Sequence, residues 1–215
     1  RINEKKIALN TGFYLGLNNK FKFTIGYNHK SILDNLDIDQ KNYIYNFIQF
    51  DYKYDTRDIF IDPTSGQEFN FKLKYNNGIS QEDYQKISFS YQKYYSLLKN
   101  HWTQPVFSHK LIYIMTFPKY DDLPFIAYEY LGGEQFVRGY SAIPVNNHHS
   151  VQEMMESSNI LFHSMEVQGT LVEKTEYYSI ELGLDWAIFL DVGLSCNNHY
   201  DFIWDDYLVG YGLGA

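Results

Sequence analysis

The sequence predicts an all-β protein whose strands form an antiparallel transmembrane β-barrel of the outer membrane. Three observations predict this fold. Apolar and polar residues alternate with a period of two in segment after segment, which sorts them onto the two faces of a strand. Aromatic residues make up 19% of the 215 residues, and this composition favours strands over helices. The connections between the alternating segments are short at one end and long at the other, as in outer-membrane barrels.

The alternation defines the strands in chain order. It is clear in residues 20–29 and 68–75, and it is longest in residues 178–195, where nine apolar residues share one face. At ~3.3 Å per residue the last segment exceeds the ~10 residues that cross a bilayer, so we expect it to project beyond the membrane. We predict nine strands, at residues 6–17, 20–29, 42–54, 67–76, 84–98, 105–117, 159–171, 177–195 and 207–214.

The connections complete the predicted architecture. Residues 17–20, 99–102 and 173–176 read as short polar turns, whereas 30–41 and 118–158 read as longer loops. Short turns are typical of the periplasmic side of a barrel and long loops of the extracellular side. No low-complexity linker divides the chain, so we expect residues 1–215 to form a single domain. We also expect an excerpt of a longer barrel, because the chain opens without Met and stops within a strand pattern.

Composition and charge exclude several other classes of protein. No apolar run approaches the ~20 residues of a transmembrane helix, which excludes a helical membrane protein. The net charge of −8 and the lack of a basic cluster make nucleic acid an unexpected partner. Cys196 is the only cysteine and is interpreted as a small residue at a strand end. A soluble β-sandwich also alternates, but the strand length and the aromatic strand ends favour the barrel.

We expect neither a metal nor a cofactor. His148 and His149 are adjacent, so in an extended segment they point to opposite sides. No carboxylate or third histidine lies at ligand spacing from them. An ordinary surface loop is therefore the favoured interpretation.

One segment between two predicted strands has the residues of a structured turn. It runs from Asp55, Arg57 and Asp58 to Pro63 and Gly66. Pro and Gly supply the fixed and the permissive backbone angles of a turn, and Asp and Thr side chains can accept hydrogen bonds from its amides.

A second motif lies inside the long loop 118–158. Paired glycines permit a close approach of the backbone to its surroundings, and an arginine fork suits carboxylates. Its residues are Gly132, Gly133, Val137, Arg138, Gly139 and Tyr140.

Two carboxylates fall on the polar face of neighbouring strands. Glu166 shares its face with Ser164 and Gln168, and Asp191 has the same orientation on the next strand. Carboxylates that point into a lumen from which water is partly excluded need a counter-charge. Arg138 is the candidate.

Together these residues resemble the barrel of the BamA/TamA superfamily of outer-membrane assembly and translocation proteins, also called bacterial surface antigens. The turn Asp55–Gly66 is similar to that family's periplasmic-turn signature, and Val137-Arg138-Gly139-Tyr140 to its defining loop motif. Residues 189–193 resemble the family's strand with an inward Asp, and residues 210–214 its glycine-rich strand. Residues 141–158 match no family pattern.

The resemblance implies both an architecture and a site. It implies a barrel of sixteen strands, of which this chain is expected to hold strands six to fourteen. The first strands, the last two and the periplasmic POTRA domains would then lie outside it. It also implies that loop 118–158 folds back into the lumen, where Arg138 pairs with Glu166 and Asp191.

The function that the resemblance implies is assembly and insertion of outer-membrane proteins, without nucleotide hydrolysis and without enzymatic activity. The implied partners are unfolded outer-membrane proteins or a secreted polypeptide, the outer-membrane lipids and accessory lipoproteins. Three alternatives stay open at this point: a two-partner secretion transporter, the barrel of a patatin-like phospholipase, and a plain porin. This sequence has no Gly-x-Ser-x-Gly nucleophile motif, so an enzyme domain would lie upstream.

Overall fold

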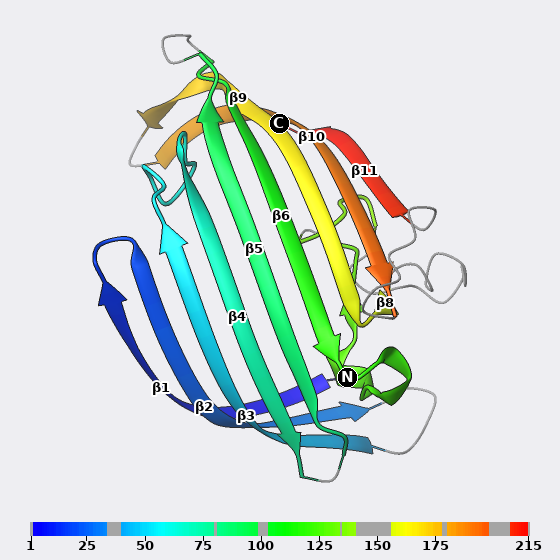
Figure 1. Ribbon diagram of the computed structural model, residues 1–215. Helices are drawn as coiled ribbons and strands as arrows, with labels where there is room; N and C mark the ends of the chain where they lie inside the picture. The colour runs from blue at the N-terminus through cyan, green and yellow to red at the C-terminus, as the bar shows by residue number, and fades with distance from the viewer. Residues whose placement is uncertain are drawn as a thin grey trace.

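Within the residues that the computed structural model describes, nine long strands lie side by side in one curved antiparallel sheet (Figure 1). The structure describes residues 2–33, 40–79, 81–98, 103–133, 135–140, 156–177, 180–197 and 207–214. The strands are neighbours in chain order, and each pairs antiparallel with the next. They are β1 (Ile2–Leu15), β2 (Asn19–Leu33), β3 (Gln40–Asp55), β4 (Gly66–Gly78), β5 (Tyr84–Ser96), β6 (Val106–Phe117), β9 (Asn159–Tyr177), β10 (Ile180–Cys196) and β11 (Tyr207–Gly214). This arrangement confirms the all-β antiparallel fold that the alternation predicts.

The two faces of the sheet differ as the alternation requires. Phe23, Phe50 and Leu73 are in register across β2, β3 and β4 and form an exposed apolar row on the outer face. On the edge strand β1, Ile7 and Leu9 are 76% and 82% exposed. No second sheet packs on these rows in the described part of the chain, as it would in a sandwich. The oily face therefore points outward.

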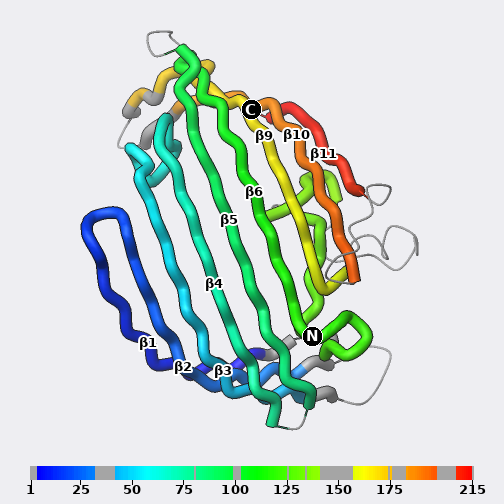
Figure 2. Tube along the Cα trace, viewed as in Figure 1, coloured from blue at the N-terminus to red at the C-terminus, as the bar shows by residue number. Residues whose placement is uncertain are grey.

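The described residues between β6 and β9 lie on the concave side of the sheet (Figure 2). They include two short 3-10 helices, η1 (Tyr120–Asp122) and η2 (Phe125–Ala127), and a small two-stranded antiparallel sheet of β7 (Glu129–Tyr130) with β8 (Glu156–Ser157). Leu131 and Val137 are fully buried against inner-wall residues of β6, β9 and β11. A second cluster joins Leu123 and Ala127 to Tyr45 and Tyr84. The loop thus supplies most of the buried apolar contact on the concave side.

The predicted turn at residues 173–176 is wrong. These residues lie within β9, which continues to Tyr177 and pairs with β10. The register shifts on either side of Leu184, so β9 carries extra residues there and bends while it stays paired. Figure 1 shows the resulting long hairpin bending across the upper end of the sheet. A local polar run is typical of a turn, but bulges also let such a run continue a strand.

The remaining strand ends shift by a few residues. β2 continues to Leu33, into the predicted loop 30–41, and Cys196 ends β10 as a buried residue. Residues 99–102 and 141–155, which include His148 and His149, lie outside the described residues. No helix in the described part of the chain is long and apolar enough to cross a membrane.

Candidate functional site: an arginine clamp on the inner wall

The segment 131–140 folds into a tight closed loop that presents Arg138. The amide of Gly133 donates to the carbonyl of Tyr140 at 2.9 Å, and the amide of Val137 donates to the carbonyl of Leu131 at 3.1 Å. Gly133 and Gly139 have φ angles of 91° and 94°, a region that side chains disfavour. The two glycines therefore allow the reversals on each side of the arginine.

The apolar residues of this loop seat it on the wall. Gly132 is buried and forms a parallel bridge with Val137, which is itself fully buried. The ring of Phe136 meets that of Phe162 edge-on, with centroids 5.7 Å apart, and Tyr140 packs at the margin. The wall residues of this cluster are Ile112, Ile114, Ile160, Phe162 and Leu208.

Two glycines of the wall make room for the loop. A Cβ on Gly210 of β11 would lie 2.3 Å from the carbonyl oxygen of Arg138. A Cβ on Gly193 of β10 would lie 2.7 Å from side-chain carbons of both Leu131 and Val137. Such distances are too short for any real Cβ contact, so only glycine permits this seat.

Arg138 grips Asp191 of β10 with both the backbone and the side chain. Its Nε and Nη2 donate to the two carboxylate oxygens at 2.8 and 2.9 Å, and its amide donates to Oδ2 at 3.1 Å. Asp191 is fully buried. Bidentate, charge-assisted pairs of this kind are among the stronger hydrogen bonds in proteins.

Further contacts complete the coordination of the guanidinium. Nη1 donates to Glu166 of β9 at 2.5 Å, and Nη2 reaches the hydroxyl of Ser164 at 3.3 Å. The guanidinium carbon lies 3.5 Å from the ring centroid of Phe189. The hydrogen bond with Asp191 raises the pKa of Arg138 above its ordinary value, burial opposes this, and Glu166 adds to the rise. Arg138 is therefore charged at any physiological pH.

The structure thus brings together Arg138, Glu166 and Asp191, which the sequence placed in separate segments. The arrangement can hold a loop against a wall, because removing one member would leave a buried charge without its partner. The sequence motifs include Phe189, Gly193 and Gly210, but they did not predict the ring beneath the guanidinium or the seat that the two glycines form. The signal would have been a glycine on the inward face of each of two neighbouring strands, since Gly210 pairs with Asp191 and Gly193 lies two residues after Asp191.

The predicted turn motif forms a second ionic cluster, at the connection between β3 and β4. Arg57 donates from Nε and Nη2 to the two oxygens of Asp55 at 2.9 and 2.8 Å, and it also contacts Glu68. Lys53 bridges the same two carboxylates at 3.1 Å each. The ring of Phe60 covers both cations, 5.1 Å from Arg57 and 5.7 Å from Lys53.

Asp58 closes this turn from within. Its carboxylate accepts hydrogen bonds from the amides of Ile59, Thr64 and Ser65 at 3.0, 3.0 and 3.2 Å and from the hydroxyl of Thr64 at 2.5 Å. Slight burial would raise the pKa of Asp58, but these hydrogen bonds outweigh it and lower the pKa to about 2.

Pro63 and Gly66 complete the turn. Pro63 is buried. Gly66 has a φ of 98°, and a Cβ on Gly66 would lie only 2.3 Å from the carbonyl oxygen of Thr56. All five predicted turn residues therefore help to shape one rigid connection.

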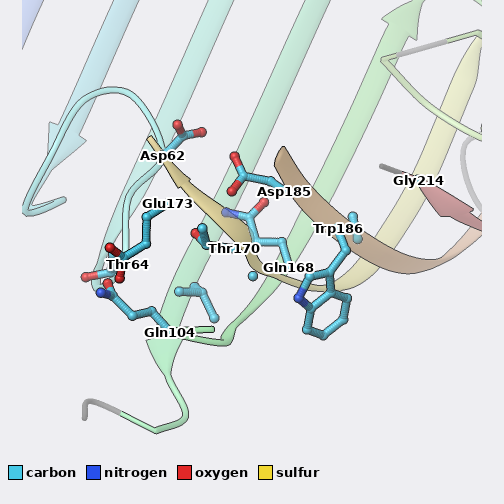
Figure 3. A pocket seen from close by; sticks show the side chains of 12 residues that line it. Asp62, Thr64, Gln104, Gln168, Thr170, Glu173, Asp185, Trp186 and Gly214 are labelled. Carbon is cyan, nitrogen blue, oxygen red and sulfur yellow. The ribbon is translucent and has the colours of Figure 1, made fainter. Parts of the chain in front are cut away.

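A hollow of about 570 Å³ separates this turn from the β9–β10 hairpin (Figure 3). Asp62 and Thr64 line it from the turn, and Glu173, Asp185 and Trp186 line it from the hairpin. In the described part of the chain, no group of three His, Cys, Asp or Glu residues could hold a metal ion.

The family model of the Omp85 superfamily domain matches residues 1–215. The chain belongs to the Omp85 superfamily. This membership confirms the family that the turn and loop motifs resemble, and the curved sheet is accordingly part of an Omp85-type barrel.

Comparison with solved structures shows the same fold. BamA from Haemophilus ducreyi, in a crystal structure lacking POTRA domains 1–3, is 15% identical and superposes with a TM-score of 0.73. The match covers 99% of this Omp85 chain and 47% of the BamA chain. No curated protein matches this chain.

Proposed function

We propose that this Omp85 chain is part of an outer-membrane barrel that assembles and inserts other outer-membrane proteins without nucleotide hydrolysis. The observation that carries the proposal is the clamp, in which Arg138 ties a long loop to Asp191 and Glu166 on the inner wall. It supports a barrel whose lumen holds a fixed protein segment. A simple diffusion pore would instead need an open lumen.

The clamp makes one side of the barrel rigid. The loop joins β6, β9, β10 and β11 through apolar contacts and ion pairs, so these strands share one set of buried contacts. An inserting barrel needs a different, weakly paired place where unpaired backbone groups can template an incoming strand. A locally thinned bilayer beside that place would lower the barrier to insertion. We infer that the clamped wall is the fixed part against which such a seam opens.

The wider assembly follows from the same proposal. We place this chain as strands six to fourteen of a sixteen-stranded barrel, with the short turns periplasmic and POTRA domains in the same protein. The chain spans about half of the BamA chain that it matches, so these features are proposals about a larger protein. Unfolded outer-membrane proteins, outer-membrane lipids and accessory lipoproteins are the proposed partners.

Depletion of the protein in its host tests the proposal. If the barrel assembles outer-membrane proteins, quantitative proteomics of the outer membrane will show many barrel proteins falling together. Loss of one secreted passenger, with other barrel proteins unchanged, would contradict the proposal and point to a two-partner transporter. Loss of small-solute uptake alone would point to a porin.

A further inference from the structure

Five buried side-chain polar atoms have no hydrogen-bond partner within the described residues, and all five lie on the inner wall. They are Thr24 Oγ1, Asn28 Oδ1, the Tyr45 hydroxyl, Asn76 Nδ2 and Thr116 Oγ1. Tyr45, Asn76 and Thr116 are no more than 2% exposed. Burial of polar groups without partners is unfavourable, so a concentration of them marks a place where an ion or water can bind.

Four of the five surround Phe47. The strand register places Asn76 directly opposite Phe47 on β4 and Gly26 directly opposite it on β2. Thr24 and Asn28 lie two residues on either side of Gly26, and Tyr45 lies two residues before Phe47 on its own strand. Positions separated by two residues share a face of a sheet. These side chains therefore form one patch on the wall.

Two lysines approach the ring of Phe47, and neither has an ion pair among the described residues. The ammonium nitrogens of Lys6 and Lys74 lie 5.0 and 4.8 Å from the ring centroid of Phe47. No described carboxylate comes within 4.0 Å of either ammonium, whereas Lys86 is paired with Glu129. Lys74 stands directly opposite Lys86 on β5, an arrangement of like charges that destabilises a sheet. The patch has an excess of positive charge.

The loop covers part of the patch. Leu123 and Ala127 pack on Tyr45 and Tyr84, and the two tyrosine rings meet edge-on at 5.2 Å. A covered site excludes much of the water that would otherwise screen its lysines, so a charged ligand there interacts strongly.

We propose that Lys6 and Lys74 bind a phosphate-type oxyanion, together with the hydroxyls of Thr24 and Tyr45 and the side-chain amide of Asn76. Two ammonium groups match its multiple charge, and the three neutral groups are donors that its oxygens can satisfy. Chloride carries a single charge and therefore matches two ammonium groups less well. The source is either free phosphate or the phosphorylated headgroup of a lipid. This site is separate from the arginine clamp and does not depend on the proposed assembly function.

Isothermal titration of the purified full-length protein in detergent with inorganic phosphate tests the site, at fixed pH and at an ionic strength held constant with chloride. We expect saturable binding, and we expect Lys74→Gln and Lys6→Gln each to weaken it roughly tenfold or more, since each removes a charged hydrogen bond. Lys20→Gln is the matched control, because Lys20 lies on the same inner face of β2 and outside the patch. It should leave binding unchanged.

A second variant keeps the test decisive if a lysine substitution disturbs folding. Asn76→Asp would place a carboxylate beside Lys74 as a built-in anion. It should raise the thermal unfolding midpoint in chloride buffer and remove the further rise that phosphate gives to the wild type. Phosphatidylglycerol in mixed micelles then identifies the source of the anion. If the lipid competes with phosphate for binding, the site takes a lipid headgroup; if it does not compete, the site takes free phosphate. No saturable binding in the wild type, or equal weakening by Lys20→Gln and Lys74→Gln, would overturn the proposal.

Discussion

Arg57 and Arg138 make almost the same contact with an aspartate, yet they connect very different parts of the molecule. Each binds both carboxylate oxygens through Nε and Nη2 at 2.8 to 2.9 Å. Arg57 reaches Asp55, two residues away, whereas Arg138 reaches Asp191, 53 residues away. The side chain of Asp55 is 25% exposed and that of Asp191 is fully buried. Equal geometry therefore gives a local turn in one place and a long-range clamp in the other.

The largest expected effect comes from the buried carboxylate. Asp191→Asn removes the charge while keeping the shape, and breaking a buried pair in this way should destabilise the barrel by about 3 kcal/mol. Urea unfolding of the full-length protein in detergent, followed by tryptophan fluorescence, measures the change. Asp185→Asn, an exposed carboxylate on the same strand, is the control and should leave the midpoint in place. An unchanged urea midpoint in Asp191→Asn would contradict the claim that Arg138 stabilises the barrel more than Arg57 does.

Displacing the loop without touching any charge should have the next largest effect. Gly210→Ala sets a Cβ against the carbonyl of Arg138, so the loop must move away from β11, at a cost of about 1–3 kcal/mol. Limited proteolysis within residues 131–140 reports the movement. Gly214→Ala is a matched control on the same face of the same strand, since nothing lies within 4 Å of the point that its Cβ would occupy. Equal cleavage of both variants would argue that packing at Gly210 does not seat the loop.

Substitution of the local arginine should have a smaller and confined effect. Arg57→Ala leaves Asp55 and Glu68 with Lys53 as a partner, so we expect a loss of about 1 kcal/mol at most. Hydrogen exchange should quicken in residues 56–65 and stay unchanged in residues 131–140. Faster exchange in residues 131–140 would show that the two clusters are coupled.

The smallest effect is the pH dependence of the turn. Because the pKa of Asp58 is lowered to about 2, the ionised carboxylate stabilises the folded turn at any pH above its ordinary value near 4. That contribution is lost as the pH falls from about 4 through about 2. Carbon NMR titration of the Asp58 carboxyl measures the midpoint, and a value near 4 would mean that the four hydrogen bonds do not form in solution.

The comparison also shows what the sequence can reveal. The strands and the faces of Glu166 and Asp191 follow from alternation, because a period of two is a local property of the chain. The turn from Asp55 to Gly66 can also be predicted from the sequence, since its hydrogen bonds join residues of the same hairpin. The turn predicted at residues 173–176 is wrong because it depends on a feature that is not local. A bulge depends on the register with β10, which no local pattern records.

The clamp could be placed only with help from the family motif. Alternation turns Glu166 and Asp191 inward, but it cannot say which loop cation meets them. Phe189 beneath the guanidinium and the seat at Gly193 and Gly210 depend on three-dimensional packing. The patch around Phe47 was missed for the same reason, because its residues come from four strands and only the register unites them.

Hydrogen exchange of residues 131–140 in the full-length protein, measured together with assembly activity in cells, tests the central claim most directly. The account predicts slow exchange in the wild type. In Arg138→Ala it predicts exchange at least about tenfold faster, as expected when a charged hydrogen bond is lost, together with impaired assembly of outer-membrane proteins. An Arg138→Ala protein with unchanged protection of this loop and full assembly activity would contradict the claim that the clamp holds the loop in its working position.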